Sequence, residues 1–147
     1  MNKLDLLSDE ELRTLILKKQ IEYIKLCQDN FLYFVKAMWP DFICRDTDVE
    51  EEWGHHQIIA NEFQNIASKV HNRLIVNMPP RHTKSEFASY LFPAWFIGKY
   101  PNKKLMQVSH NAELATRFGS KVRNLMDTDE YKSIFGDVKL REDSKAK

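Results

Sequence analysis

Apolar residues recur at helical spacing over three long stretches of the chain. In residues 8–28, Ser8 and Glu11 form the capping pattern Ser-x-x-Glu, and apolar side chains then follow every three or four positions. Residues 53–70 and 112–126 show the same period. The apolar stripe of the second stretch consists of Ile58, Ile59, Phe63, Ile66, Ala67 and Val70. We predict a helix over each stretch.

Shorter segments complete the helical pattern. Residues 31–39 are rich in aromatic side chains, and we expect a short buried helix that ends before Pro40. A further helix is expected from residue 84 to about residue 97, where Pro93 would kink it or end it early. A helical turn is expected over residues 129–135.

The hydrophobic period changes in two runs rich in apolar residues, residues 73–78 and 104–109. Both predict buried strands, and Pro79 and Pro80 would end the first, since proline cannot donate to a sheet ladder. Residues 137–142 could form a further strand. The order strand, loop, helix, strand, helix implies parallel strands joined by a right-handed crossover. We therefore expect an α/β fold preceded by an α-helical N-terminal segment.

Charge is distributed unevenly along the 147 residues, although the net charge is only +1. Residues 1–72 carry 8 basic and 13 acidic side chains, and residues 73–147 carry 14 basic and 8 acidic ones. A basic half can face phosphate groups, but it can equally be an unevenly charged, solvated surface. No apolar run reaches the roughly 18 residues of a membrane helix. Two cysteines, Cys27 and Cys44, form neither a disulfide framework nor a zinc-binding pair.

The segment with the clearest chemistry is residues 78–85, Met-Pro-Pro-Arg-His-Thr-Lys-Ser, hereafter loop 78–85. It lies between a predicted strand and a predicted helix, as a phosphate-binding loop requires. Backbone N–H groups at the helix start attract phosphate, Lys84 adds a point charge, and the Ser85 hydroxyl can ligate Mg²⁺. In the usual pattern, G-x-x-x-x-G-K-[ST], Met78 and Thr83 replace both glycines. The alternative is a rigid proline turn with one exposed lysine.

The string from Arg73 to Glu86, RLIVNMPPRHTKSE, resembles the N-terminal ATPase region of tailed-phage terminase large subunits. Members of that family carry a loop of the form PPRHGKS, from which Thr83 departs. The segments around the loop add to the resemblance. These are residues 56–59, 92–95, 107–115 and 118–124, and the similarity covers about residues 30–145.

The resemblance implies roles for individual residues, with ATP and Mg²⁺ as cofactors. Lys84 and Arg81 would be catalytic, with Lys84 on the β- and γ-phosphates and Arg81 on the γ-phosphate. Ser85 would coordinate Mg²⁺, and Gln57 would read the adenine edge. The ATP-binding set would be Gln57, Pro80, Arg81, His82, Thr83, Lys84 and Ser85. For His82 we expect a role in shaping the loop, and for His55 and His56 no metal site.

The same resemblance implies a P-loop NTPase-type parallel sheet flanked by helices, and an ATP-driven motor that moves double-stranded DNA into procapsids. The expected partners are double-stranded DNA, a portal protein, a small terminase subunit and identical subunits in a ring, with no membrane. The expected location is the cytoplasm of a bacterial host. The expected division is a helical segment over residues 1–52 and a partial ATPase domain over residues 53–147.

Two parts of a complete motor are not found in the sequence. After Leu125 no hydrophobic run ends in paired acidic residues, which ATP hydrolysis needs for Mg²⁺ and the attacking water, and no carboxylate cluster suggests a nuclease. We therefore expect a fragment with little ATPase activity. Two alternatives stay open: a helicase-like nucleic-acid ATPase fragment, and a non-catalytic binding protein encoded by a prophage remnant.

Overall fold

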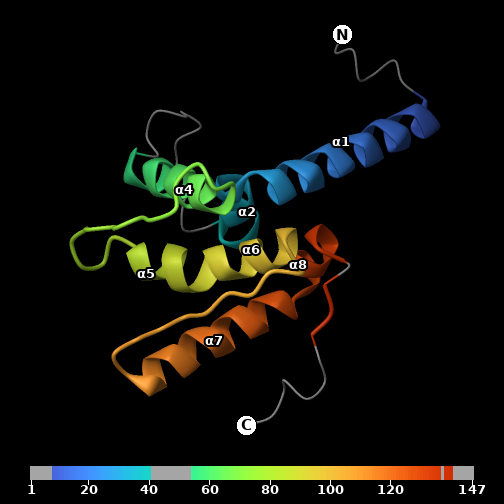
Figure 1. The fold of residues 1–147 in the computed structure, drawn as a ribbon. Coiled ribbons are helices and arrows are strands. Elements are labelled where there is room, and N and C mark those ends of the chain that lie inside the picture. Colours follow the sequence, from blue (N-terminus) through green and yellow to red (C-terminus); the bar gives the residue numbers. More distant parts are fainter. Residues whose placement is uncertain (1–7, 41–53, 137, 141–147) are drawn as a thin grey trace.

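The computed structural model describes residues 8–40, 54–136 and 138–140, and their regular structure is helical (Figure 1). The helices are α1 (Asp9–Asp29), α2 (Phe31–Met38), α4 (Gly54–Ala67), α5 (Lys84–Glu86), the π-helical turn η3 (Phe87–Leu91), α6 (Phe92–Lys99), α7 (Ala112–Met126) and α8 (Asp129–Ile134). The continuous helical run α5–η3–α6 contacts α2 and α4 on one side and α7 on the other.

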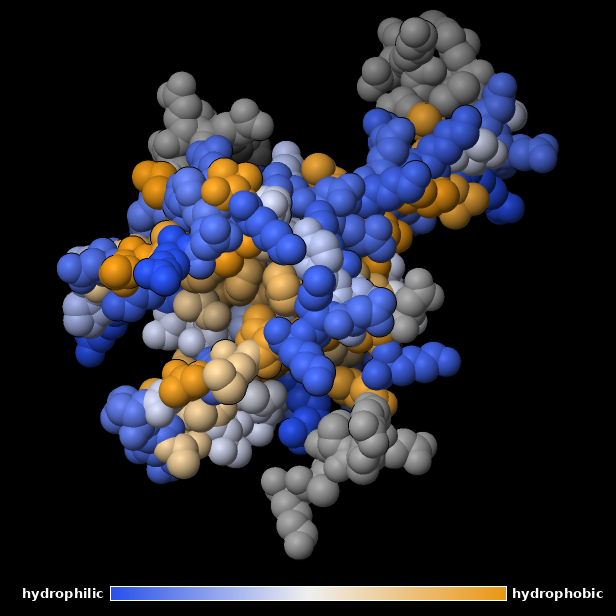
Figure 2. Space-filling view, in the orientation of Figure 1, coloured by the Kyte–Doolittle hydropathy of each residue, from blue (hydrophilic) through white to orange (hydrophobic). Residues whose placement is uncertain are grey.

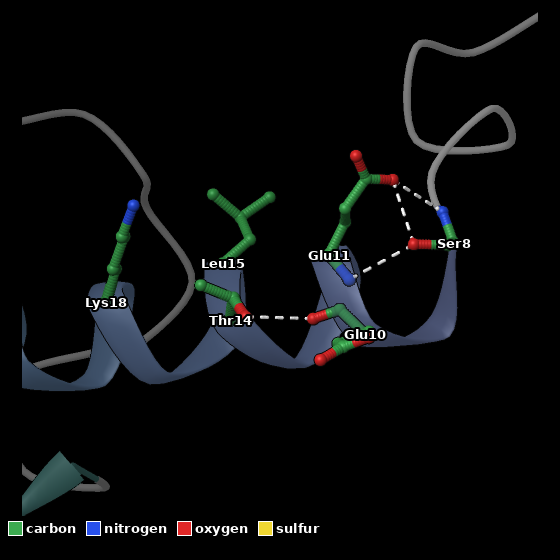
Figure 3. A pocket seen from close by; sticks show the side chains of 6 residues that line it. All are labelled: Ser8, Glu10, Glu11, Thr14, Leu15 and Lys18. Atoms are coloured by element: carbon green, nitrogen blue, oxygen red, sulfur yellow. Dashed lines mark hydrogen bonds between the residues drawn. The ribbon is translucent and has the colours of Figure 1, made fainter.

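Helix α1 begins as its sequence predicts. The Ser8 N–H donates to Glu11 Oε2 at 2.9 Å, and the Glu11 N–H donates to Ser8 Oγ at 3.3 Å. Figure 3 shows this reciprocal pair at the helix start, with Thr14 donating to the Glu10 carbonyl one turn further on. The capping box satisfies two of the N–H groups that a helix start leaves without partners.

The N-terminal part of α1 projects from the other helices (Figure 1). Its single buried residue is Cys27, near the C-terminal end. Apolar side chains along the projecting part are exposed to solvent, and Figure 2 shows them among hydrophilic neighbours. They include Leu12, Leu15, Ile16, Leu17 and Ile21. Within the described ranges, neither α1 nor any other helix combines the length and apolar character that crossing a membrane requires.

Aromatic side chains dominate the core. The Phe31 ring lies with its centroid 5.4 to 6.2 Å from four other rings, which are those of Phe63, Phe87, Phe92 and Trp95. Polar atoms in this core are bonded: Trp95 Nε1 donates to the Cys27 carbonyl at 3.1 Å, and the Tyr131 hydroxyl donates to the Ala94 carbonyl at 2.9 Å. The core therefore joins α1, α2, α4, η3, α6, α7 and α8.

Pro93 neither ends the helix nor breaks it. The preceding turn widens to a π-helix, in which the Phe92 N–H donates to the Phe87 carbonyl. Proline has no N–H for the carbonyl four residues earlier, that of Ser89. Instead the Gln107 side chain donates to the Ser89 carbonyl at 3.2 Å. The helix consequently continues to Lys99, with Pro93 in the first turn of α6.

The predicted parallel sheet is wrong, because the described residues contain no strand. In residues 73–78 and 104–109 exposure alternates along the chain, as a strand pattern would give, and Ile75 and Met106 are 95% and 85% exposed. No backbone hydrogen bond joins these two described segments. A strand needs a partner for its backbone groups, whereas a helix bonds within itself. The described residues 138–140 of the third strand candidate are not a strand either.

The helix predictions fare better. Helix α7 has the predicted bounds, residues 112–126, and α2 ends at Met38, before Pro40. Helix α8 covers most of the helical turn expected at residues 129–135. Helix α4 ends at Ala67, earlier than predicted, and Trp53, its expected first residue, lies outside the described residues. Local capping and helical periodicity were thus sufficient for these elements.

Candidate phosphate-binding site

Loop 78–85 has an unusual backbone. Arg81 and Thr83 both adopt positive φ angles, 65° and 63°. Such angles are uncommon for residues other than glycine, and for a β-branched residue they are strongly disfavoured. Thr83 stands where the usual phosphate-loop pattern has its second glycine. The loop therefore adopts, with threonine, a backbone conformation that glycine adopts freely.

Thr83 is also the residue at which the helix begins. It is left-handed, with φ 63° and ψ 5°, and its side chain does not cap the helix. The N–H groups of a helix's first turn have no partner within the helix. A left-handed residue followed by right-handed ones turns successive N–H groups toward one concave side, an arrangement that suits an anion. The start of the helical run at Lys84 thus offers donors rather than a capped end.

The charges around this helix start are mainly positive. Lys84 Nζ lies 3.4 Å from the Met78 carbonyl oxygen, so the side chain folds back over the loop. Arg81 is exposed to solvent. The one acidic residue in the first turn, Glu86, is paired with Lys121 of α7 at 3.0 Å. Because Lys121 holds the Glu86 carboxylate, Lys84 and Arg81 have no ion-pair partner among the described residues.

Three histidines pack around the loop. The ring centroid of His56 lies 3.9 Å from that of His55, and His55 lies 5.8 Å from His82. His56 stacks on Phe87 at 5.6 Å, and His56 Nε2 is 3.1 Å from Thr83 Oγ1. Burial, and then the two neighbouring histidines, lower the pKa of His56 to about 4. His56 is consequently neutral at pH 7.

His82 makes a bond within the loop. Its Nδ1 lies 2.9 Å from the Pro80 carbonyl oxygen, and because a carbonyl only accepts, Nδ1–H is the donor. The prediction that His82 shapes the loop agrees with this contact. Among the described residues, no group of histidine, cysteine or acidic side chains is arranged to hold a metal ion.

A cavity of about 490 Å³ opens beside the helix start, between α4, residues 72–76 and the helical run α5–η3–α6. Lys84 and Ser85 line it, together with apolar side chains that include Phe63, Leu74 and Phe92. Ser85 is exposed on the first turn, where its hydroxyl is available to a ligand. The lining of the cavity thus combines the polar start of the helix with apolar side chains.

The structure places Gln57 and His56 differently from the sequence-based expectation. Gln57 is exposed on α4 and does not line the cavity. His56 contacts the loop, although no contact with the loop was predicted for it. The signal was available: His56 precedes the buried Ile59 and Ala60 by three and four residues, which puts it on the buried face of α4. Ile58, expected in the apolar stripe, is 65% exposed.

The start of α7 lies within residues 107–115, one of the segments that add to the terminase resemblance. Asn111 caps this helix by accepting from the Glu113 N–H at 2.7 Å. Lys121, one of the basic residues of α7, is engaged within the fold by Glu86 and lies 5.0 Å above the Tyr90 ring. Lys121 is therefore a structural residue of the α7 packing rather than a freely solvated charge.

Comparison of the chain with protein-family models, with curated proteins and with solved structures gives no match. The similarity to terminase large subunits therefore rests on the residues of the chain alone. What loop 78–85 can bind follows from its own backbone geometry and charges.

Proposed function

We propose that the chain binds Mg²⁺-ATP through loop 78–85, as the ATP-binding part of a terminase large subunit that drives double-stranded DNA into procapsids. The observation that supports this proposal is the backbone conformation at the point where the loop meets the helix. There, left-handed Thr83 leads into an uncapped first turn that bears Lys84 and Ser85. The proposal concerns the loop and its helix, and it does not depend on a sheet.

The donors of the loop suit a chain of phosphates. The first-turn N–H groups and the positive end of the helix dipole attract phosphate oxygens. Lys84 and Arg81 add two positive charges, while the carboxylate of Glu86, in the same helical turn as Lys84, is held by Lys121. Lys84 would bind the terminal phosphates, because the carbonyl of Met78 is a weak partner that a phosphate can replace.

Ser85 would carry the Mg²⁺ ion that accompanies the phosphates. Mg²⁺ is usually held by one or two protein oxygens together with phosphate oxygens and water. Within the first turn, the exposed Ser85 hydroxyl meets this need next to Lys84. The described residues contain no group of acidic side chains arranged to complete the ion's coordination, so the proposal is for binding and not for turnover.

The role of Lys84 is tested by equilibrium binding of Mg²⁺-ATP to the full chain, measured by titration calorimetry. Replacing Lys84 with alanine removes the point charge on the phosphates and should weaken binding by about a hundredfold, corresponding to about 2.7 kcal/mol. The matched control is Lys104→Ala, an exposed lysine away from the loop, which should leave the affinity unchanged. Equal affinity for Mg²⁺-ATP in the wild type and Lys84→Ala would overturn the proposal.

The role of Ser85 is tested by the dependence of binding on the metal. The wild type should bind ATP more tightly with Mg²⁺ than with a chelator present, and Ser85→Ala should reduce this difference. Ser89→Ala is the control, since Ser89 lines the same cavity one turn further along the helix. If Ser85→Ala keeps the full effect of Mg²⁺, Ser85 is not the metal ligand.

A further inference from the structure

Thr83 is held in a conformation that its own side chain disfavours. Its φ of 63° brings the β-carbon of an L-residue too close to the following backbone. Such a residue persists only where its surroundings fix it, and disfavoured backbone angles gather at binding sites. The structure must therefore contain contacts that keep Thr83 left-handed.

Two hydrogen bonds on one hydroxyl supply these contacts. Thr83 Oγ1 lies 2.7 Å from the His82 carbonyl oxygen and 3.1 Å from His56 Nε2. The carbonyl only accepts, so the hydroxyl proton goes to His82. His56 must then donate from Nε2–H to Thr83 Oγ1. The geometry thus fixes both the direction of the bond and the tautomer of His56.

The helices hold His56 in place for this bond. Its ring stacks on Phe87 at a centroid distance of 5.6 Å and an interplanar angle of 18°. Phe87 is fully buried and packs edge-on against Phe31 of the core at 5.9 Å. A chain of contacts therefore runs from the core through Phe87 and His56 to the backbone of Thr83.

We propose that His56 is a positioning residue for the phosphate-binding loop, which keeps Thr83 left-handed by a hydrogen bond and so does with threonine what glycine does without support. The inference rests on the proposed nucleotide binding for its functional readout. His56 contacts Thr83, and its proposed effect on binding passes through the loop backbone. The burial that lowers the pKa of His56 agrees with this role, because it keeps the ring neutral near pH 7.

Coupling between the two residues gives a sharp test. His56→Ala should weaken Mg²⁺-ATP binding by about tenfold, the usual effect of one lost hydrogen bond to an otherwise disfavoured conformation. Thr83→Gly should bind as tightly as the wild type or more tightly, since glycine needs no support. The double variant His56→Ala/Thr83→Gly should then bind like Thr83→Gly alone. If the double variant is as weak as His56→Ala, His56 acts in another way and the inference fails.

Two further variants keep the test independent of general folding defects. His56→Gln retains a side-chain N–H that can donate to Thr83 Oγ1, so it should bind within about threefold of the wild type. His71→Ala is the matched control and should not change the affinity, since His71 follows the C-terminal end of α4 and lies 3.7 Å from Glu62. Loss of binding in His56→Gln as large as in His56→Ala would contradict the hydrogen-bonding role.

A readout without nucleotide separates this inference from the proposed function. The backbone chemical shifts and the HN–Hα coupling of Thr83 report its φ in the free protein. They should show a left-handed residue in the wild type and His56→Gln, and a shift away from it in His56→Ala. Should Lys84→Ala keep its Mg²⁺-ATP affinity, the proposed function fails while this test still stands. Unchanged Thr83 signals in His56→Ala would overturn the inference alone.

Discussion

The aromatic core and loop 78–85 are neighbours that are built in opposite ways. In the core, side chains such as Phe31 and Trp95 are almost fully buried, and the polar atoms of the described core side chains are bonded. In the loop, the side chains are largely exposed, two backbone angles are unfavourable, and Lys84 and Arg81 form no ion pair with a described residue. Phe87 connects the two regions, because its ring contacts Phe31 in the core and also His56, which contacts Thr83 of the loop. The difference indicates that packing in the core stabilises the fold, and that this stability offsets the unfavourable backbone angles of the loop.

The largest effect on stability should come from the centre of the core. Phe31→Ala removes a ring that contacts four others, and by the usual cost of such a cavity it should lower the free energy of unfolding by ~3–5 kcal/mol. Urea unfolding measures this change. Ile75→Ala, at a side chain that is 95% exposed, is the control and should change stability by less than ~0.5 kcal/mol. Similar losses in both variants would contradict the described core.

A close approach in the core should give the next largest effect. A β-carbon at Gly98 would lie 2.6 Å from the Phe135 ring and 2.7 Å from the Tyr131 hydroxyl. Gly98→Ala should therefore destabilise the fold by ~1–3 kcal/mol, the usual cost of overpacking. Gly119→Ala is the matched control: it lies within α7 with no atom near, and should stabilise the helix by ~0.5–1 kcal/mol. Thermal unfolding of both variants tests the opposite signs.

The pH dependence of stability should reveal His56. Its pKa is lowered from 6.5 to about 4 in the folded chain, so the unfolded chain binds the proton first. The resulting stability is present in full above pH 6.5 and is lost as the pH falls from 6.5 to about 4. A pKa shift of this size corresponds to a free energy of about 3 kcal/mol, and partial exposure of the ring reduces the expected effect on stability to ~1–2 kcal/mol. His56→Gln should remove this part of the pH dependence in urea unfolding.

The smallest effect should come from the ion pair that joins α5 to α7. Lys121→Met removes the ion pair between Lys121, with a side chain that is 37% exposed, and Glu86, with a side chain that is 27% exposed. Partly exposed pairs contribute ~0–1 kcal/mol, and the loss should shrink as salt is added. Unfolding at low and at high ionic strength measures it. A larger, salt-independent loss would show that the packing of Lys121 on Tyr90 outweighs its charge.

Local signals predicted helices correctly, but they also predicted a sheet that the described residues do not form. Ser8 and Glu11 bond within one turn, and the apolar residues of α7 repeat within one helix, so both were readable from the sequence. Residues 73–78 and 104–109 have strand-like sequences, yet a strand forms only when another segment pairs with its backbone. Among the described residues none does, and the run of apolar residues misled the prediction.

For the candidate site, the sequence predicted the loop residues but not what supports them. Lys84 and Ser85 lie at the helix start, as expected from the motif. The motif shows that Thr83 replaces a glycine, but the contact that supports Thr83 comes from another helix, 27 residues away along the chain. Local patterns likewise did not predict the π-helical turn before Pro93. The Gln107 side chain bonds the Ser89 carbonyl in this turn, and that contact joins separate segments of the chain.

The most direct test of nucleotide binding by loop 78–85 is an NMR titration of the isotope-labelled full chain with Mg²⁺-ATP, following every backbone amide. We predict that the largest shifts fall on residues 81–86, with smaller ones at His56, and that Lys84→Ala abolishes them. No shifts at millimolar Mg²⁺-ATP, or shifts confined to other parts of the chain such as α1 or the start of α7, would contradict the account.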